Sequence, residues 1–345
     1  MLLIIPSLSV WADGRHHKKN DTLYIYQKID TTFIEDLHDM LNVRAIAVKR
    51  YNKFSITDNI SSSKLEYEIN DDLNMGLGFS FKSIGLEFQY TPPGINNNNA
   101  KYGKSAQYAL STGGNSRRFI YDAYYKFSQG FHTTSAYKIP STNVGASPEY
   151  ADIYRPDIRN YNAGFNVLYI FNNKRFSSSA PYSFTQRQIK SAGSLLLGTY
   201  ALLYGITADS AIFPDSLKRF FQPAVQFKNA SSITWGISCG YTYTLVYRKY
   251  WYVNIFTVPG ISVQEFYSVN AYNQTSSSKV ALGLTLQSRF SIGFNKKLNF
   301  LGICYNANNY LINNDAKSSL SYKFSSIRIY YGHRFDLRKV LKKYF

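Results

Sequence analysis

Residues 233–247 alternate between two kinds of side chain with a strict period of two. The odd positions carry Ile, Trp, Cys, Tyr and Leu, and the even positions from Thr234 to Thr244 carry only Thr, Gly and Ser. A period of two places each kind on its own face of a β-strand. A long strand with large rings on one face and small polar groups on the other is typical of a wall between hydrocarbon and a lumen.

The same alternation recurs along the chain. Many of the alternating segments are longer than the strands of a soluble sandwich, which have about 5–6 residues. The alternation is found in residues 65–82, 84–90, 117–128, 280–295 and 327–335. The connections between such segments are alternately long and short. The pattern therefore predicts an all-β protein, a transmembrane antiparallel β-barrel of about twelve strands. A strand pair within residues 175–189 would raise the number to fourteen.

Composition excludes a helical membrane protein. Much of the hydrophobic content lies in 31 Tyr and 24 Phe, and the best apolar run, residues 194–206, is interrupted by Gly and Thr. A membrane-spanning helix needs about 20 consecutive apolar residues.

The net charge of +18 is scattered and forms no single stripe, so lipid phosphates or anionic sugars are better partners for it than nucleic acid. Gly-rich stretches lack the strand-to-helix context of a nucleotide site.

The chain divides into a barrel and short appendages. Residues 1–12 resemble a signal peptide that lacks a basic n-region, which indicates a truncated start or a false match. Residues 13–40 form a periplasmic segment, where the spacing of Thr32 and Glu35 predicts a short helix. Residues 41–335 form the barrel. Residues 336–345 are a basic amphipathic tail. We expect the outer membrane of a Gram-negative cell, with both termini in the periplasm.

The inward phase of the strands defines the candidate functional residues. The charged side chains expected to line the lumen are Arg118, Lys126, Arg289, Arg328, Arg334, Glu87 and Asp122. An excess of cations would favour an anion-preferring pore. Alternatively these charges pair across a narrow lumen and plug it, which is the interpretation we favour. Residues 175–189 are then part of the plug, with Gln186, Arg187, Gln188 and Lys190 as its polar groups.

No pattern indicates catalysis, a metal site or a cofactor, so we expect no catalytic residues and no enzyme. His333 lies on the outward phase near the end of the last strand, where it could serve a lipid hydrolase together with a nearby Ser. An amphipathic anchor at the membrane interface is the simpler interpretation. Cys239 and Cys304 lie far apart within strand patterns and are interpreted as structural free thiols.

Three stretches resemble an uncharacterised family of outer-membrane barrel proteins from Bacteroidota, domain of unknown function 4421. They are residues 154–177, 186–198 and 330–335, and the likeness extends over most of the chain. After Phe176 and Ser177 the chain departs from the expected pattern: residues 178–181 are Ser, Ser, Ala and Pro in place of an aromatic residue and small apolar residues. The resemblance implies an outer-membrane barrel and no particular activity.

The expected function is a structural or accessory role in the cell envelope. Outer-membrane lipid is one expected partner. A second envelope protein is the other candidate, bound through periplasmic segments or through the long, aromatic-containing connections 131–157 and 207–229. The first alternative is a porin-like, narrow channel for anions or small solutes. The second is an outer-membrane lipid-modifying enzyme.

Overall fold

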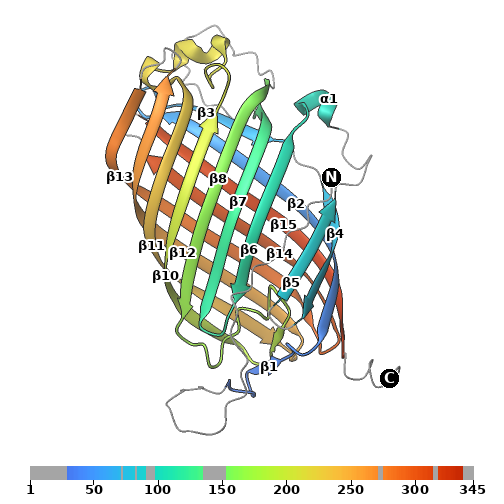
Figure 1. Cartoon of the computed structure of the whole chain (residues 1–345). Helices are drawn as coiled ribbons and strands as arrows, with labels where there is room; N and C mark the ends of the chain where they lie inside the picture. Colours follow the sequence, from blue (N-terminus) through green and yellow to red (C-terminus); the bar gives the residue numbers. More distant parts are fainter. Residues whose placement is uncertain are drawn as a thin grey trace, which may run out of the picture.

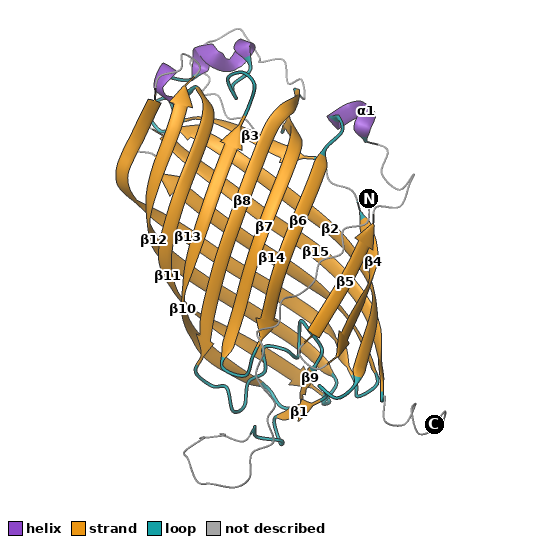
Figure 2. Cartoon of the chain, viewed as in Figure 1, coloured by secondary structure: helices purple, strands orange, loops and turns teal. Residues whose placement is uncertain are grey.

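The computed structural model describes residues 29–70, 73–81, 84–90, 98–134, 153–270, 275–313 and 318–336. Tilted strands wrap around one axis to form a barrel (Figure 1). Two short strands, β1 and β9, lie at one end of it, and two 3-10 helices, η1 and η2, lie at the other (Figure 2). We call these the β9 end and the η end.

Almost all regular structure in the described residues is strand. The strands are β1 Ile34–Asp36, β2 Leu41–Asp58, β3 Ser63–Ile69, β4 Asn74–Phe81, β5 Ile84–Tyr90, β6 Ala106–Asn115, β7 Phe119–Thr133, β8 Tyr154–Ile170, β9 Gln186–Gln188, β10 Ala192–Thr207, β11 Phe227–Tyr247, β12 Trp251–Asn270, β13 Thr275–Asn295, β14 Asn299–Asn313 and β15 Ser318–Phe335. The helices are α1 Asn99–Tyr102, η1 Asp215–Phe220 and η2 Pro223–Val225.

Antiparallel ladders close the strands into a ring. The last strand, β15, pairs with β2 from Ser318 opposite Asp58 to Phe335 opposite Leu41. The ring contains ten strands, in the order β2, β3, β7, β8, β10, β11, β12, β13, β14, β15. Closure gives each strand of the ring a neighbour on both sides, which a spanning sheet requires in hydrocarbon. The all-β antiparallel barrel that the sequence predicts is confirmed.

The number of strands in the ring differs from the expected twelve. The stretch 65–82, which the alternation presents as one strand, is two strands, β3 and β4, that pair with different parts of β2. β5 pairs with β4 and β6 pairs with β7, and no ladder among the described residues joins β5 to β6. Within residues 175–189 only β9 is a strand, and it pairs with β1 outside the ring.

The two faces of the wall have the surroundings that the alternation predicts. On β11 the outward Trp235 and Ile237 are 63% and 60% exposed, whereas the inward Thr234 and Ser238 are 2% and 3% exposed. The other strands present further exposed Leu, Ile, Tyr and Phe side chains on the outside. An outer surface this apolar around a polar interior is that of an outer-membrane-type barrel, which faces lipid.

Small inward residues make room for large side chains that cross the lumen. A Cβ added at Gly236 would lie 2.3 Å from Cζ of Tyr200, and one added at Gly260 would lie 2.9 Å from Cε1 of the same ring. Tyr200 is 3% exposed. The glycines of β11 and β12 therefore serve the packing of this tyrosine inside the barrel.

The helix predicted near residue 35 is wrong. Residues 34–36 are the strand β1, and its residues pair with Gln186, Arg187 and Gln188 of β9. Thr32 donates from its backbone N–H and its hydroxyl to Asp30, not within a capping box. Pairing with β9 offers this segment a sheet partner, which outweighs a weak local helix signal. The predicted signal peptide and nearly all of the predicted tail lie outside the described residues.

A charge at mid-height on the outer face should destabilise the barrel. Ile261, at the centre of β12, is 59% exposed, and Ile261→Arg is expected to lower the free energy of unfolding by about 2–4 kcal/mol because the guanidinium enters the hydrocarbon midplane. Tyr247→Arg, at the end of β11, is the control and should cost about 0–1 kcal/mol. Urea unfolding in lipid vesicles measures both. Equal effects at the two positions would contradict a hydrocarbon belt.

Candidate functional site

The η end of the lumen is filled by the connection that contains η1 and η2. Ile212, Phe213 and Phe221 are between 0% and 5% exposed and pack against rings from several strands of the wall. Tyr67 of β3 donates its hydroxyl proton to the carbonyl of Ile212. Phe213 and Phe221, two aromatic residues of the connection 207–229, are therefore buried inside the barrel. Internal packing explains the aromatic content that suggested a partner surface.

The middle of the lumen is crossed by contacts between strands that are not neighbours. The hydroxyls of Tyr124 on β7 and Tyr310 on β14 lie 3.1 Å apart. The rings of Tyr204 on β10 and Tyr322 on β15 have their centroids 5.1 Å apart, and these two strands face each other across the ring. Side chains from opposite sides of the wall therefore meet in this part of the lumen.

The β9 end is filled by residues 176–188, which turn into the barrel. The carbonyl of Pro181 accepts hydrogen bonds from the hydroxyls of Tyr252, Ser291 and Tyr330 at 3.4–3.5 Å. The ring of Phe184 stacks on Phe300 with centroids 4.4 Å apart and an interplanar angle of 10°. The Pro181 carbonyl and the Phe184 ring of this segment thus contact side chains on the strands of the wall.

Arg334 fixes the filling segment to the end of the last strand. Its side chain is 1% exposed. Nε donates to the carbonyl of Phe184 at 2.9 Å, Nη1 to the carbonyl of Lys296 at 2.7 Å, and Nη2 to Oδ1 of Asn295 at 2.8 Å. A guanidinium suits this site because its planar fork holds several acceptors at once.

Of the four polar residues expected in the plug, three lie on β9 and have partners there, and the fourth, Lys190, lies outside it. Gln186 accepts from the Ser177 hydroxyl at 2.5 Å, and Gln188 donates from Nε2 to three backbone carbonyls, those of Phe33, Arg175 and Lys190. Arg187 is paired with Glu35 of β1 at 2.6 Å.

Lys190 does not belong to the plug. It is exposed and lies with Nζ 5.3 Å from the centre of the Phe33 ring. The reason is that the chain has left the lumen after β9 and is entering β10.

Most of the charged residues assigned to the lumen are paired there. Arg289 on β13 reaches Asp122 on β7 at 2.8 Å. Arg328 contacts Glu87 at 3.3 Å, and Arg44, which the sequence analysis did not single out, contacts the same carboxylate at 3.4 Å.

Two further cations assigned to the lumen have different surroundings. Lys126 lies with Nζ 3.1 Å from the centre of the Phe324 ring and 4.5 Å from that of Tyr124. Arg118 was placed wrongly. It lies in the bend before β7, at the β9 end, and it is exposed, because the strand and its alternation begin only at Phe119.

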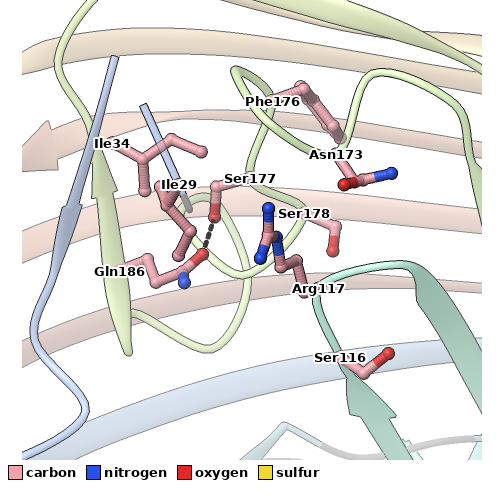
Figure 3. Close-up of a pocket in the computed structure, with 9 residues that line it drawn as sticks. All are labelled: Ile29, Ile34, Ser116, Arg117, Asn173, Phe176, Ser177, Ser178 and Gln186. Atoms are coloured by element: carbon pink, nitrogen blue, oxygen red, sulfur yellow. Dashed lines mark hydrogen bonds between the residues drawn. The ribbon is translucent and has the colours of Figure 1, made fainter. Parts of the chain in front are cut away.

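A small cavity of about 10 Å³ lies at the β9 end (Figure 3). It is lined by Ile29, Ile34, Ser116, Arg117, Asn173, Phe176, Ser177, Ser178 and Gln186. Nε and Nη2 of Arg117 are buried there and have no hydrogen-bond partner among the described residues. The volume suits about one water molecule, which is too little for an organic ligand.

Among the described residues, no group of three or more His, Cys, Asp or Glu is placed to hold a metal ion. His333 contacts Oδ1 of Asn299 through Nδ1 at 2.6 Å and lies against the ring of Phe335. Near the β9 end, a hydrogen bond from the Thr32 hydroxyl lowers the pKa of Asp30, and Arg175 acts in the same direction. No helix in the described part of the chain is long and apolar enough to cross a membrane.

Comparison with solved structures finds other outer-membrane proteins. The outer membrane protease OmpT of Escherichia coli is 9% identical, with a TM-score of 0.40 and coverage of 87% of this chain and 98% of that one. The toluene transporter TodX of Pseudomonas putida is 7% identical, with a TM-score of 0.24 and coverage of 86% and 90%. The outer membrane protein OmpT of Vibrio cholerae, in a form lacking loop L8, is 11% identical, with a TM-score of 0.24 and coverage of 84% and 98%.

The likeness to a protease overturns the expectation that the chain is not an enzyme. A similar barrel carries out proteolysis, so a fold of this kind does not exclude catalysis. At 9% identity and a TM-score of 0.40 the likeness assigns neither an activity nor a residue role to this chain.

No curated protein sequence is similar enough to this chain to count as a relative. A family model does match, over residues 28–335. That range includes all the strands from β1 to β15 and the three stretches on which the resemblance was based. The chain therefore belongs to the family described as Domain of unknown function (DUF4421).

Proposed function

We propose that the protein is a closed, non-conducting barrel of the outer membrane with a structural or accessory role in the envelope. The observation that carries this proposal is the filling of the lumen at three levels. Residues 212–227 occupy the η end, the tyrosine contacts cross the middle, and residues 176–188 occupy the β9 end. A lumen filled in this way is a packed core and offers solutes no path.

The charged residues of the lumen support the closed barrel over the narrow anion channel. Arg289 and Arg328 each contact a carboxylate, Asp122 and Glu87, and Arg334 is enclosed by backbone and amide oxygens. An anion-selective pore needs cations that face water along a continuous path. Here these groups connect the wall to itself or to the filling segment.

Conductance tests the closed lumen directly. Purified protein in planar bilayers is expected to give no stepwise current. Replacing residues 178–184 and residues 212–226 with Gly-Ser linkers removes Phe184 and the Pro181 carbonyl from the β9 end and removes Ile212, Phe213 and Phe221 from the η end. Together with Tyr204→Ala and Tyr322→Ala, these replacements should produce discrete steps. A control with Arg118→Gln, at the exposed bend, should stay silent. Steps from the unmodified protein would support the channel and overturn the proposal.

We further propose that the β9 end and both termini face the periplasm. Support comes from the short turns at this end, such as residues 248–250 between β11 and β12, because outer-membrane barrels have short periplasmic turns and longer extracellular loops. Lys249→Cys, in a Cys239→Ser background, is expected to react with a membrane-impermeant maleimide only after the outer membrane is permeabilised. Reaction in intact cells would reverse this orientation.

The accessory role requires a partner at an exposed end of the barrel. Lys174, near the filling segment, is exposed, so a neighbouring molecule can reach its side chain, while its carbonyl accepts a hydrogen bond from the N–H of Asp30. A photo-crosslinking benzoylphenylalanine at Lys174 is expected to yield a protein adduct in intact cells. The same group at Leu284, on the lipid face, is the control and should yield none. Recovery of unmodified monomer alone from both variants would count against the accessory role.

A further inference from the structure

A groove crosses the outer face of the wall from β10 to β15. Its volume is about 720 Å³, which lies within the ~300–1,000 Å³ typical of pockets that hold a small ligand. Strands β10 to β15 are consecutive neighbours in the ring, so the groove lies over one continuous part of the sheet. Most of its outward lining is apolar and comes from Leu197, Ile237, Ile261, Leu284, Leu286 and Leu311.

Short side chains explain why the wall is hollowed here. Cys239 of β11 and Pro259 of β12 both line the groove and are exposed. Their outward neighbours two residues along the same strands are the larger Ile237 and Ile261. A thiol and a proline ring extend less far from the sheet than these branched side chains, so they leave space on the outer face.

The groove runs obliquely between the two ends of the barrel. Leu197 lies near the start of β10, at the β9 end, whereas Lys323 lies near the start of β15, at the η end. The strands are tilted (Figure 1), so a row of paired residues climbs from one end toward the other. The residues that the ladders place in this row between Leu197 and Lys323 are Cys239, Pro259, Leu286 and Asn309.

The end of the groove that lies toward the η end is polar and positively charged. Asn309, Ser321 and Lys323 line it, and Lys323 is exposed. Lys323 lies as many residues from the β9 end of β15 as Val263 does on β12, and Val263 is an exposed apolar side chain. An ammonium group at the level of a hydrocarbon-facing side chain is destabilising unless another group compensates its charge.

The carboxylates nearest to Lys323 in the sheet are engaged by another lysine. The ladders place Lys323 between Asn309 of β14 and Lys53 of β2, and like charges directly opposite each other in a sheet are unfavourable. Nζ of Lys53 lies 2.6 Å from a carboxylate oxygen of Glu68 and 3.7 Å from one of Glu66. Among the described residues Lys323 forms no ion pair, so its charge is available to an anion from outside the chain.

The order of apolar and charged groups along the groove matches a lipid molecule. The groove opens on the face of the wall where exposed Leu, Ile and aromatic side chains contact the bilayer. Its cation lies toward the η end, where a headgroup reaches the membrane interface, and its apolar part continues toward the β9 end, through the hydrocarbon. A bilayer lipid with a negatively charged headgroup complements both parts at once.

We propose that this groove is a binding site for an anionic phospholipid from the leaflet at the η end. Phosphate oxygens of the headgroup accept hydrogen bonds from Nζ of Lys323 and from the side-chain amide of Asn309. The acyl chains lie along Leu286 and Ile261 toward Leu197. The site is on the outside of the barrel, so it depends neither on a closed lumen nor on an accessory partner.

Native mass spectrometry of the full chain tests the charged end of the site. The protein is taken from mixed micelles with equal amounts of phosphatidylglycerol and phosphatidylcholine that carry the same acyl chains, and wild type is expected to retain phosphatidylglycerol preferentially. Lys323→Gln should lower that preference roughly 5-fold, the effect of losing one attraction of ordinary strength between a lysine and an anionic lipid. Lys323→Arg keeps the charge and should keep the preference.

A matched control removes the same charge from the opposite end of the barrel. Lys297→Gln, in the exposed turn between β13 and β14, should leave the preference unchanged. Equal retention of the two lipids by wild type, or equal effects of Lys323→Gln and Lys297→Gln, would overturn the proposal.

Filling the groove tests its apolar part. Cys239→Trp places a large ring in the groove and should lower the retention of phosphatidylglycerol, whereas Leu245→Trp, on the same face of β11 but outside the groove, should not. Phosphatidylglycerol with a diazirine in one acyl chain is expected to label β11 to β13 more than β7 and β8, and Cys239→Trp should remove the difference. Even labelling of these strands in wild type, or a dimer of the chain that retains no lipid, would overturn the proposal.

Discussion

Satisfaction of every backbone polar group in hydrocarbon is the constraint on which the rest of the structure depends. It requires a closed ladder, and the eighteen paired positions of β15 and β2 provide the closure. Once the ring is closed, one face of each strand must contact lipid, so large apolar side chains occupy it. The opposite faces share a narrow interior, where polar and aromatic side chains contact one another across the axis.

The filled interior distinguishes this barrel from an open pore. Tyr204 and Tyr322 pack ring against ring, and Tyr252 and Tyr330 share a hydrogen bond at 2.7 Å. The bond between Tyr252 and Tyr330 offsets the cost of burying their hydroxyls in a low-dielectric interior, whereas the hydroxyls of Tyr204 and Tyr322 have no hydrogen-bond partner among the described residues. The small residues Gly236 and Gly260 make room for another inward ring, that of Tyr200. The lumen thus behaves as a core that holds opposite walls together.

Alternation with a period of two was enough to predict the barrel and its inward and outward faces, whereas the plug of paired inward charges stays a prediction. The pattern could not show the break between β3 and β4, because the alternation continues across it. Nor could it show that no ladder among the described residues joins β5 to β6, because edge pairing is set by tertiary structure. Arg118 was misplaced because a pattern does not reveal where a strand begins. Tyr204 and Tyr322 were missed although they lie on the inward phase, since an inward aromatic resembles any other strand residue until its partner across the ring is known.

The most direct test of the account is whether the outer face meets acyl chains. Trp235 is 63% exposed at the middle of β11. In a Trp11→Phe, Trp251→Phe variant it is the remaining tryptophan of the three in the chain. Its fluorescence in vesicles should be strongly quenched by lipids brominated on the acyl chains and little by bromide in the water. Strong quenching by aqueous bromide, with none by brominated acyl chains, would contradict a membrane-spanning barrel.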